Sequence, residues 1–290
     1  MPIFDTHCHY NLEPLYSGQN FAFKIKDNDP ILNKDWHDHW QKAQDCDIKA
    51  SLIPGAGLTS SEKAVKIAEQ EKNLFASVGV HPLRAQKIEL ESAIATIEKL
   101  SKSKKVVAIG EVGLDYFSLA ENENLAAIKQ NQEKLFIEQI KLAAKNKLTL
   151  IVHARDREDE AYWRILELVE NYWPQEQAII FHCASGPIDY IKTALKIKNS
   201  FFGFDGNITF KNAANLRELF NLVQEKTPEK IILETDAPYL APVPHRGKIC
   251  EPWMISDLTQ FVKQELNANL EQIFNNSLQA FNLGNYKLII

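Results

Sequence analysis

Histidine and carboxylate residues recur along the chain, each at the end of a short apolar or β-branched run. Imidazole nitrogens combined with carboxylate oxygens are typical ligands of zinc, manganese and iron, and such mixed sites can also hold magnesium. One tetrahedral ion needs about four ligands, so a larger set is explained most simply by two ions that share a carboxylate. The candidate metal ligands are His7, His9, Glu111, His153, His182 and Asp236.

Two of these histidines are separated by a single residue. In a strand, side chains two positions apart point to the same face, so Asp5, His7 and His9 would point one way and Cys8 the other. His7 and His9 could then chelate one ion. A His-x-His pair alone indicates metal binding only weakly, and the other candidates strengthen it because they also follow apolar runs.

These residues stand in an alternating pattern of predicted strands and helices. Short apolar runs predict strands at 3–7, 50–54, 74–80, 106–111, 148–153, 178–182, 200–204 and 231–234. Stretches with helical spacing predict helices at 34–45, 61–72, 89–102, 124–146, 158–172, 187–198, 212–225 and 255–282.

The alternation predicts the fold class. Strand–helix units without a linker rich in Pro, Gly or Ser favour one domain over 1–290, a closed (β/α)8 TIM barrel, with an open doubly wound sheet as the second choice. Active sites of this barrel lie at the C-terminal ends of the strands. All the candidate ligands fall at those predicted ends, so we expect them to meet on one rim.

Composition limits the class of protein. The chain has 290 residues, 33 basic against 38 acidic side chains, a net charge of −5 and 45% hydrophobic residues, which exclude a disordered chain. No apolar run approaches the length of a membrane span and no signal peptide is evident, so a cytoplasmic protein is expected. Without a Cys-x-x-Cys pair, the cysteines are expected to be reduced, with Cys8 and Cys183 as core residues.

The excess of acidic residues also bears on the substrate. Tight, sequence-independent binding of nucleic acid normally requires a basic surface. Any phosphate chemistry must therefore draw its positive charge from groups within the site.

Five motifs follow one another along the chain: Asp-Thr-His-Cys-His at 5–9, Gly-Glu-Val-Gly-Leu-Asp-Tyr at 110–116, Ile-Val-His-Ala-Arg at 151–155, His-Cys-Ala-Ser-Gly at 182–186 and Leu-Glu-Thr-Asp-Ala-Pro-Tyr-Leu-Ala-Pro at 233–242. Together they resemble the motifs of TatD-type metal-dependent deoxyribonucleases, members of the amidohydrolase superfamily, from residue 2 to about 283. The resemblance implies a barrel with two divalent metal ions (Mg, Zn or Mn) that acts on DNA. It further implies that His7, His9, Glu111 and Asp236 hold one ion, that Glu111, His153 and His182 hold the other, and that Glu111 bridges them.

The sequence departs from the family pattern at pocket positions. Leu83 stands where a second histidine often follows Gly-x-His-Pro. Phe117 stands where a polar residue commonly follows Gly-Leu-Asp-Tyr, and Cys250 stands where Asn usually precedes Glu-Pro. Residues 11–45 also look longer than the usual first loop and helix, and we expect them to form an elaboration near the active rim. Within it, His37 and His39 would diverge on a helix, which favours packing over a second metal pair.

Further polar residues near the predicted rim have a functional and a structural interpretation. His81, Arg155 and Arg246 are candidate substrate contacts, or else a structural histidine and solvated charges. Glu234 is expected to hydrogen-bond a ligand histidine. Asp236, beside the site of the attacking water, is the candidate general base, with Glu111 as the second catalytic residue.

The sequence, with the resemblance, therefore predicts a hydrolase that cleaves DNA phosphodiester bonds with a metal-activated water, as an exonuclease at strand ends. No membrane and no obligate protein partner are indicated. Two alternatives stay open: an amidohydrolase or esterase, such as an aminoacyl-tRNA deacylase, and a non-catalytic metal-binding barrel.

Overall fold

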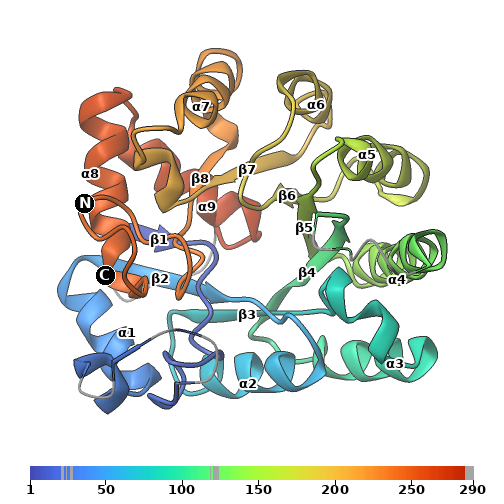
Figure 1. The fold of residues 1–290 in the computed structure, drawn as a ribbon, viewed down its shortest axis with the longest axis horizontal. Coiled ribbons are helices and arrows are strands. Elements are labelled where there is room, and N and C mark those ends of the chain that lie inside the picture. Colours follow the sequence, from blue (N-terminus) through green and yellow to red (C-terminus); the bar gives the residue numbers. More distant parts are fainter. Residues whose placement is uncertain (21–22, 24, 27–28, 118, 120–123, 285–290) are drawn as a thin grey trace.

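The computed structural model describes residues 1–290 except 21–22, 24, 27–28, 118, 120–123 and 285–290. In this part of the chain, eight parallel strands follow one another in sequence order, each paired with the next (Figure 1). The Asp236 N–H donates to His7 O at 2.9 Å and so links the segments that follow the last and first strands. The predicted (β/α)8 barrel is confirmed, and the open sheet is wrong. The strands are β1 (Ile3–Asp5), β2 (Ile48–Ile53), β3 (Leu74–Val78), β4 (Val106–Asp115), β5 (Thr149–Arg155), β6 (Ile179–Phe181), β7 (Ser200–Phe204) and β8 (Ile231–Leu233).

Helices surround the strands (Figure 1). The α-helices of the described residues are α1 (Trp36–Asp45), α2 (Leu58–Ala68), α3 (Leu90–Leu100), α4 (Leu125–Asn146), α5 (Glu160–Tyr172), α6 (Ile188–Ala194), α7 (Ala214–Lys226), α8 (Ile255–Glu265) and α9 (Leu270–Ala280). Short 3-10 helices join them at η1 (Pro30–Asn33), η2 (Pro82–Lys87), η3 (Gly206–Thr209), η4 (Pro228–Lys230) and η5 (Pro252–Met254). None of the helices described is both long enough and apolar enough to cross a membrane.

Two helices, α2 and α6, end four residues before their predicted C-termini, and lysines that bond the carbonyl groups beyond each end account for the difference. Lys105 Nζ donates to the carbonyl oxygens of Glu71, Lys72 and Leu74, beyond the end of α2. Lys230 Nζ donates to Leu195 O and Ile197 O, beyond the end of α6. These bonds satisfy carbonyl groups that a longer helix would otherwise bond internally, so the chain can turn directly into the next strand.

The predicted closing helix at 255–282 is wrong as a single element. The chain leaves α8 at Leu266, and Asn267 has a positive φ of 53°, which breaks the helical path. A new helix then starts because the Asn269 side chain accepts the N–H groups of Glu271 and Gln272. The break allows α9 to turn beneath the barrel and pack against β8 and β1.

Apolar side chains fill the interior of the barrel and close its N-terminal end. Phe4 of β1 lies 6.1 Å from the ring of Phe75 and 5.6 Å from that of Phe281, just after α9. Each fully buried side chain of this size contributes roughly 1.5–3 kcal/mol. Because this end is packed, the polar residues that face the barrel axis gather at the opposite end. The interior cluster includes Phe4, Ala50, Leu52, Phe75, Ala108, Ile151, Ile180, Phe201, Ile232, Phe274 and Phe281.

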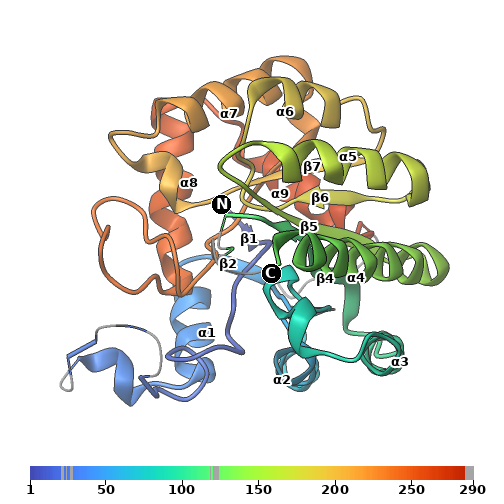
Figure 2. The same ribbon diagram turned by 45° about the vertical axis from the view of Figure 1, so that its right-hand side comes forward.

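The first helical segment is tied to the chain that follows β8. Glu251 accepts hydrogen bonds from Lys34 and Lys42 and lies 3.3 Å from the ring of buried His39 (Figure 2 shows α1 below α8). His37 instead is exposed and pairs with Asp35. The two histidines therefore diverge as predicted. Parts of the proposed elaboration at 11–45, namely 21–22, 24 and 27–28, lie outside the described residues.

Candidate metal centre

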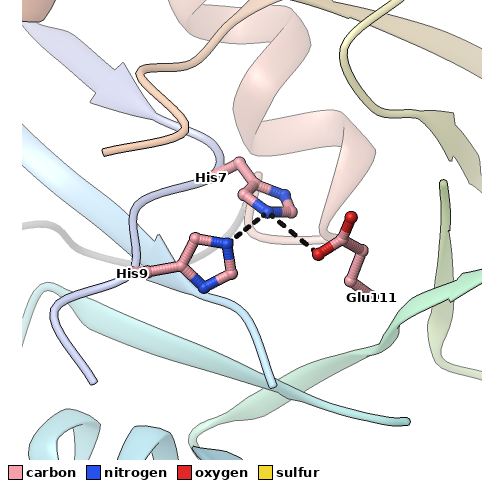
Figure 3. Close-up of side chains that lie close together, drawn as sticks. All are labelled: His7, His9 and Glu111. Carbon is pink, nitrogen blue, oxygen red and sulfur yellow. Dashed lines mark hydrogen bonds and ion pairs between the residues drawn. The ribbon is translucent and has the colours of Figure 1, made fainter. Parts of the chain in front are cut away.

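His7 and His9, which follow β1, meet Glu111 of β4 at the C-terminal end of the barrel (Figure 3). The Nε2 atoms of His7 and His9 are 3.3 Å apart. Asp236 Oδ1 lies 3.8 Å from His7 Nε2 and 3.4 Å from His9 Nε2, and Glu111 Oε2 lies 3.8 Å from His7 Nε2. Two nitrogens and two carboxylate oxygens thus point at one small volume.

The expected alternation of side chains along the first strand holds only as far as Asp5. β1 ends there and the chain bends at Thr6, so the orientation of His7 and His9 does not follow from strand geometry. Asp5 does not join the ligand group, because its carboxylate accepts hydrogen bonds from the backbone N–H and the hydroxyl of Thr235. Cys8 is fully buried, and burial raises the pKa of its thiol, which agrees with the expected core role.

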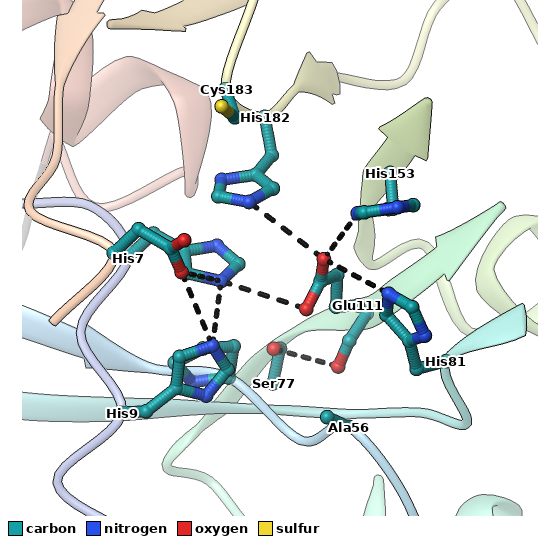
Figure 4. A network of polar contacts seen from close by, with 12 residues as sticks. His7, His9, Ala56, Ser77, His81, Glu111, His153, His182 and Cys183 are labelled. Atoms are coloured by element: carbon teal, nitrogen blue, oxygen red, sulfur yellow. Dashed lines mark hydrogen bonds and ion pairs between the residues drawn. The ribbon is translucent and has the colours of Figure 1, made fainter. Parts of the chain in front are cut away.

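A second group of side chains surrounds the other oxygen of Glu111 (Figure 4). Glu111 Oε1 lies 2.7 Å from His153 Nδ1, 3.7 Å from His182 Nε2 and 3.7 Å from His81 Nε2. Glu111 therefore turns one oxygen toward His7 and the other toward His153 and His182. A carboxylate shared by two ions requires this arrangement.

The spacing of the donor atoms fits metal coordination. Two zinc–nitrogen bonds of about 2.0–2.1 Å at a tetrahedral angle place the nitrogens about 3.3–3.4 Å apart. The His7 and His9 nitrogens are separated by 3.3 Å. The groups whose ligand atoms lie within 4.8 Å of one another include His7, His9 and Glu111, and also Glu111, His153 and His182. The chemistry and spacing of these residues therefore suit divalent cations.

Burial and mutual contacts shift the pKa values of this cluster strongly. Burial lowers the pKa of His182, but the charge and hydrogen bond of Glu234 outweigh it and raise the pKa to about 10. Burial likewise lowers the pKa of His153, and hydrogen bonds to Asp115 and Glu111 raise it to about 9. Burial raises the pKa of Glu111, while neighbouring histidines bring it well below its usual range. In the metal-free protein, protons on His153 and His182 offset buried negative charge, and a bound cation would displace them.

Two carboxylates lie beside the ligand histidines, and only one of them was predicted from the sequence to do so. Glu234 Oε1 lies 2.8 Å from His182 Nδ1, which confirms its predicted hydrogen bond to a ligand histidine. Asp115 was not among the predicted site residues, yet its Oδ2 lies 3.3 Å from His153 Nε2. The prediction missed it because β4 was expected to end at Glu111 and instead continues to Asp115. Its place in the Gly-Glu-Val-Gly-Leu-Asp-Tyr motif was the available signal.

The structure gives the surroundings of each predicted substrate contact. His81 makes the contacts expected of a structural histidine, since its Nδ1 accepts the Leu83 N–H at 3.2 Å and its Nε2 lies 3.7 Å from Glu111 Oε1. Arg155 and Arg246 are exposed, and their guanidinium carbons lie 4.2 Å from ring centres, of Phe117 and of Phe210 respectively. Contact of His81, Arg155 or Arg246 with a substrate stays a prediction.

The chain is similar to known proteins over nearly its whole length. Residues 4–282 match the family model described as TatD related DNase. An uncharacterized metal-dependent hydrolase of Mycoplasma pneumoniae is 33% identical over 295 residues, covering 97% of this chain and 100% of that protein. The uncharacterized metal-dependent hydrolase YabD of Bacillus subtilis is 27% identical, covering 93% of this chain and 94% of that protein.

Solved structures share the fold. YjjV, a TatD homologue from Escherichia coli, superposes with a TM-score of 0.79 at 22% identity, covering 97% of this chain and 98% of that one. A TatD-family hydrolase from Entamoeba histolytica superposes with a TM-score of 0.77 at 20% identity, covering 98% and 99%. At these identities the likeness shows the barrel alone.

Proposed function

Because the chain belongs to the family of TatD-related DNases and is a metal-dependent hydrolase, we propose that it hydrolyses the phosphodiester bonds of DNA as an exonuclease at strand ends. The relatives described above are named only as hydrolases, so the substrate is inferred from the site. The observation that carries the inference is the distribution of arginines around the metal centre.

Exposed arginines without carboxylate partners gather at the metal-binding end of the barrel. Within the described residues, none of the arginines in this group forms an ion pair with Asp or Glu, whereas Arg164, on the outer helix α5, pairs with Glu133 and Glu167. Unpaired guanidinium groups suit the oxygens of a phosphodiester. They supply local positive charge on a chain whose net charge is −5. The group comprises Arg84 after β3, Arg155 and Arg157 after β5, and Arg246 after β8.

We assign two divalent ions, Mg, Zn or Mn, to the centre. His7, His9, Glu111 and Asp236 would hold one, and Glu111, His153 and His182 the other. When bound, such ions lower the pKa of a water molecule and offset negative charge on a phosphoryl oxygen. The protein's part is to hold the ligands in place by burial, since His7 and His182 are 0% and 5% exposed.

Asp236 is suited to accept a proton from the attacking water. Its side chain is 16% exposed, against 6% for Glu111, so it is the carboxylate of the two that solvent and substrate reach more readily. It lies within 3.4 Å of His9, at the mouth of the ligand group. Arg155 at the end of β5 and Arg246 after β8 would bind phosphate oxygens, and His81 would contact the substrate or fix Glu111.

The same ligands would also support ester or amide hydrolysis, as in an aminoacyl-tRNA deacylase, and only the arginines favour phosphate. The test is a metal-reconstituted screen of linear single-stranded DNA, circular single-stranded DNA, duplex DNA, RNA and a nitrophenyl ester. We expect cleavage of linear DNA and little cleavage of circles. Asp236→Asn, purified in the same way, controls for contaminating nucleases. Rapid ester turnover without cleavage of DNA would overturn the proposal, and no turnover of any substrate would favour a binding protein.

A further inference from the structure

The ring of His153 lies between two carboxylates, one on each nitrogen. Nδ1 is 2.7 Å from Glu111 Oε1, and Nε2 is 3.3 Å from Asp115 Oδ2. A neutral imidazole carries one proton, and only the nitrogen without it can bind a metal. Which carboxylate receives the N–H therefore decides whether His153 offers a lone pair to the metal centre.

We propose that Asp115 is a positioning residue for the metal centre: it accepts the Nε2–H of His153 and thereby directs the Nδ1 lone pair toward Glu111. The inference rests on the proposed role of His153 as a ligand, and it does not depend on the substrate. Asp115 itself contacts no metal in this arrangement.

Asp115 is held rigidly enough to orient a neighbouring ring. Asp115 as a whole residue is only 1% exposed. Its N–H donates to Gln132 Oε1 at 2.9 Å, and its carbonyl accepts from Gln132 Nε2 at 3.0 Å. Gln132 is equally buried, on α4. β4 and β5 are paired with Gly113 opposite His153. The strand pairing and the two hydrogen bonds to Gln132 therefore fix Asp115 relative to the His153 ring without any bound ion.

The second ligand histidine has the same support on its other nitrogen. His182 Nδ1 lies 2.8 Å from Glu234 Oε1, which also accepts the N–H of Cys183 at 2.6 Å. Carboxylates that accept the remote N–H of a ligand histidine fix its tautomer and strengthen metal binding. His7 differs, since its Nδ1 is buried without a partner among the described residues. A carboxylate therefore supports each of the two histidines that are assigned to the same ion.

A competing interpretation uses the same atoms differently. Ligand atoms of His81, Asp115 and His153 all lie within 4.8 Å of one another, so these residues could hold an ion of their own. Nε2 of His153 would then be a ligand, and its proton would have to sit on Nδ1, facing Glu111. The 2.7 Å contact between Nδ1 and Glu111 Oε1 would then be a hydrogen bond, and His153 would no longer be a ligand of the ion bound by Glu111. The two interpretations predict different numbers of ions.

The experiment measures Co²⁺ binding by visible absorption in the metal-free full-length protein and in four variants. Asp115→Ala should weaken one Co²⁺ position by about 10–100-fold and alter its spectrum, while the number of ions bound at saturation stays unchanged. Asp115→Asn, which is nearly isosteric and keeps an acceptor oxygen, should retain part of the affinity. His153→Ala tests the ligand role itself.

Asp156→Asn is the matched control. Asp156 lies just beyond β5, but its oxygens accept backbone N–H groups of Arg157, Glu158 and Ala161, so the substitution should leave Co²⁺ affinity unchanged. Unaltered affinity in both Asp115 variants, with weakened binding in His153→Ala, would overturn the proposal while sparing the ligand assignment. Loss of one whole equivalent of Co²⁺ in Asp115→Ala would overturn it in favour of the separate ion. Unchanged binding in His153→Ala would remove its premise.

Discussion

Glu251→Gln should destabilise the protein by loosening the first helical segment from the chain that follows β8. The Glu251 carboxylate lies 3.2 Å from Lys34 Nζ, 3.2 Å from Lys42 Nζ and 3.3 Å from His39 Nδ1. The lysine side chains are 31% and 38% exposed, so each pair contributes only about 0.2–1 kcal/mol. His39 is fully buried and its Nδ1 lies 3.3 Å from the carboxylate, outside hydrogen-bond geometry, and such a buried polar contact contributes about 1–3 kcal/mol. Glutamine keeps the size and one acceptor, so we expect a loss of about 2–3 kcal/mol at pH 7.

The loss should depend on pH with a defined sign. Burial raises the pKa of Glu251, but the close contact with His39 and the two lysine charges bring it well below its usual range. A depressed pKa stabilises the fold above the unfolded value of about 4.3, and this contribution disappears as pH falls below that value. Denaturant unfolding of both proteins should show the full difference at pH 7 and a smaller one below about pH 4.

Glu176→Gln is the control for the Glu251 prediction, because the Glu176 side chain is 77% exposed and, among the described residues, forms an ion pair with exposed Lys198 alone. It should leave the unfolding curve where it is. Equal stability of Glu251→Gln and the unchanged protein at pH 7, or a difference that grows as the solution is acidified, would refute the reasoning.

Three further outcomes follow from the site. Asp236→Asn should lower kcat by roughly 10²-fold or more with KM little changed, at verified metal content; near-normal kcat would refute the base role. Arg246→Ala should mainly raise KM, with a smaller loss of kcat, in kinetics on oligonucleotides; the opposite split would place Arg246 at the reacting phosphate. Zn²⁺ binding should release protons and tighten from pH 7 toward pH 9, because His153 and His182 have pKa values of about 9 and 10. Calorimetry in buffers of different ionisation enthalpy checks this, and proton uptake would contradict it.

Much of the fold could be predicted from the sequence because parallel strands of a barrel are short, buried and apolar. The repeat of such runs located each strand, and the strand ends then gathered distant ligands such as His7 and His182 on one rim. The residue at which each strand ends was harder to predict, because it depends on pairing with a neighbouring strand. β4 runs on to Asp115 because it stays paired with β5 as far as Arg155, and no local pattern reveals that pairing.

The interactions that the sequence did not reveal join residues far apart in the chain. His39 and Glu251 meet only because α1 and the chain before η5 pack together, and neither residue carries a local sign of the other. The Asp5 carboxylate turns to Thr235 because β1 ends early, which alternation along a strand does not predict. The break between α8 and α9 depends on Asn267 adopting a positive φ, a conformation that asparagine permits without requiring.

The central claim is that Glu111 is shared by two divalent ions held by His7, His9, Asp236, His153 and His182. Mn²⁺ titration of the metal-free protein, with bound metal counted per chain, tests it most directly when repeated on Glu111→Ala. Two divalent cations about 4 Å apart repel each other by about 17 kcal/mol at an effective dielectric of roughly 20, and a shared carboxylate offsets part of this repulsion. We predict two ions per chain in the unchanged protein and loss of at least one in Glu111→Ala, with the fold retained by circular dichroism. A full complement of two ions in Glu111→Ala, or a single ion in the unchanged protein, would contradict the account.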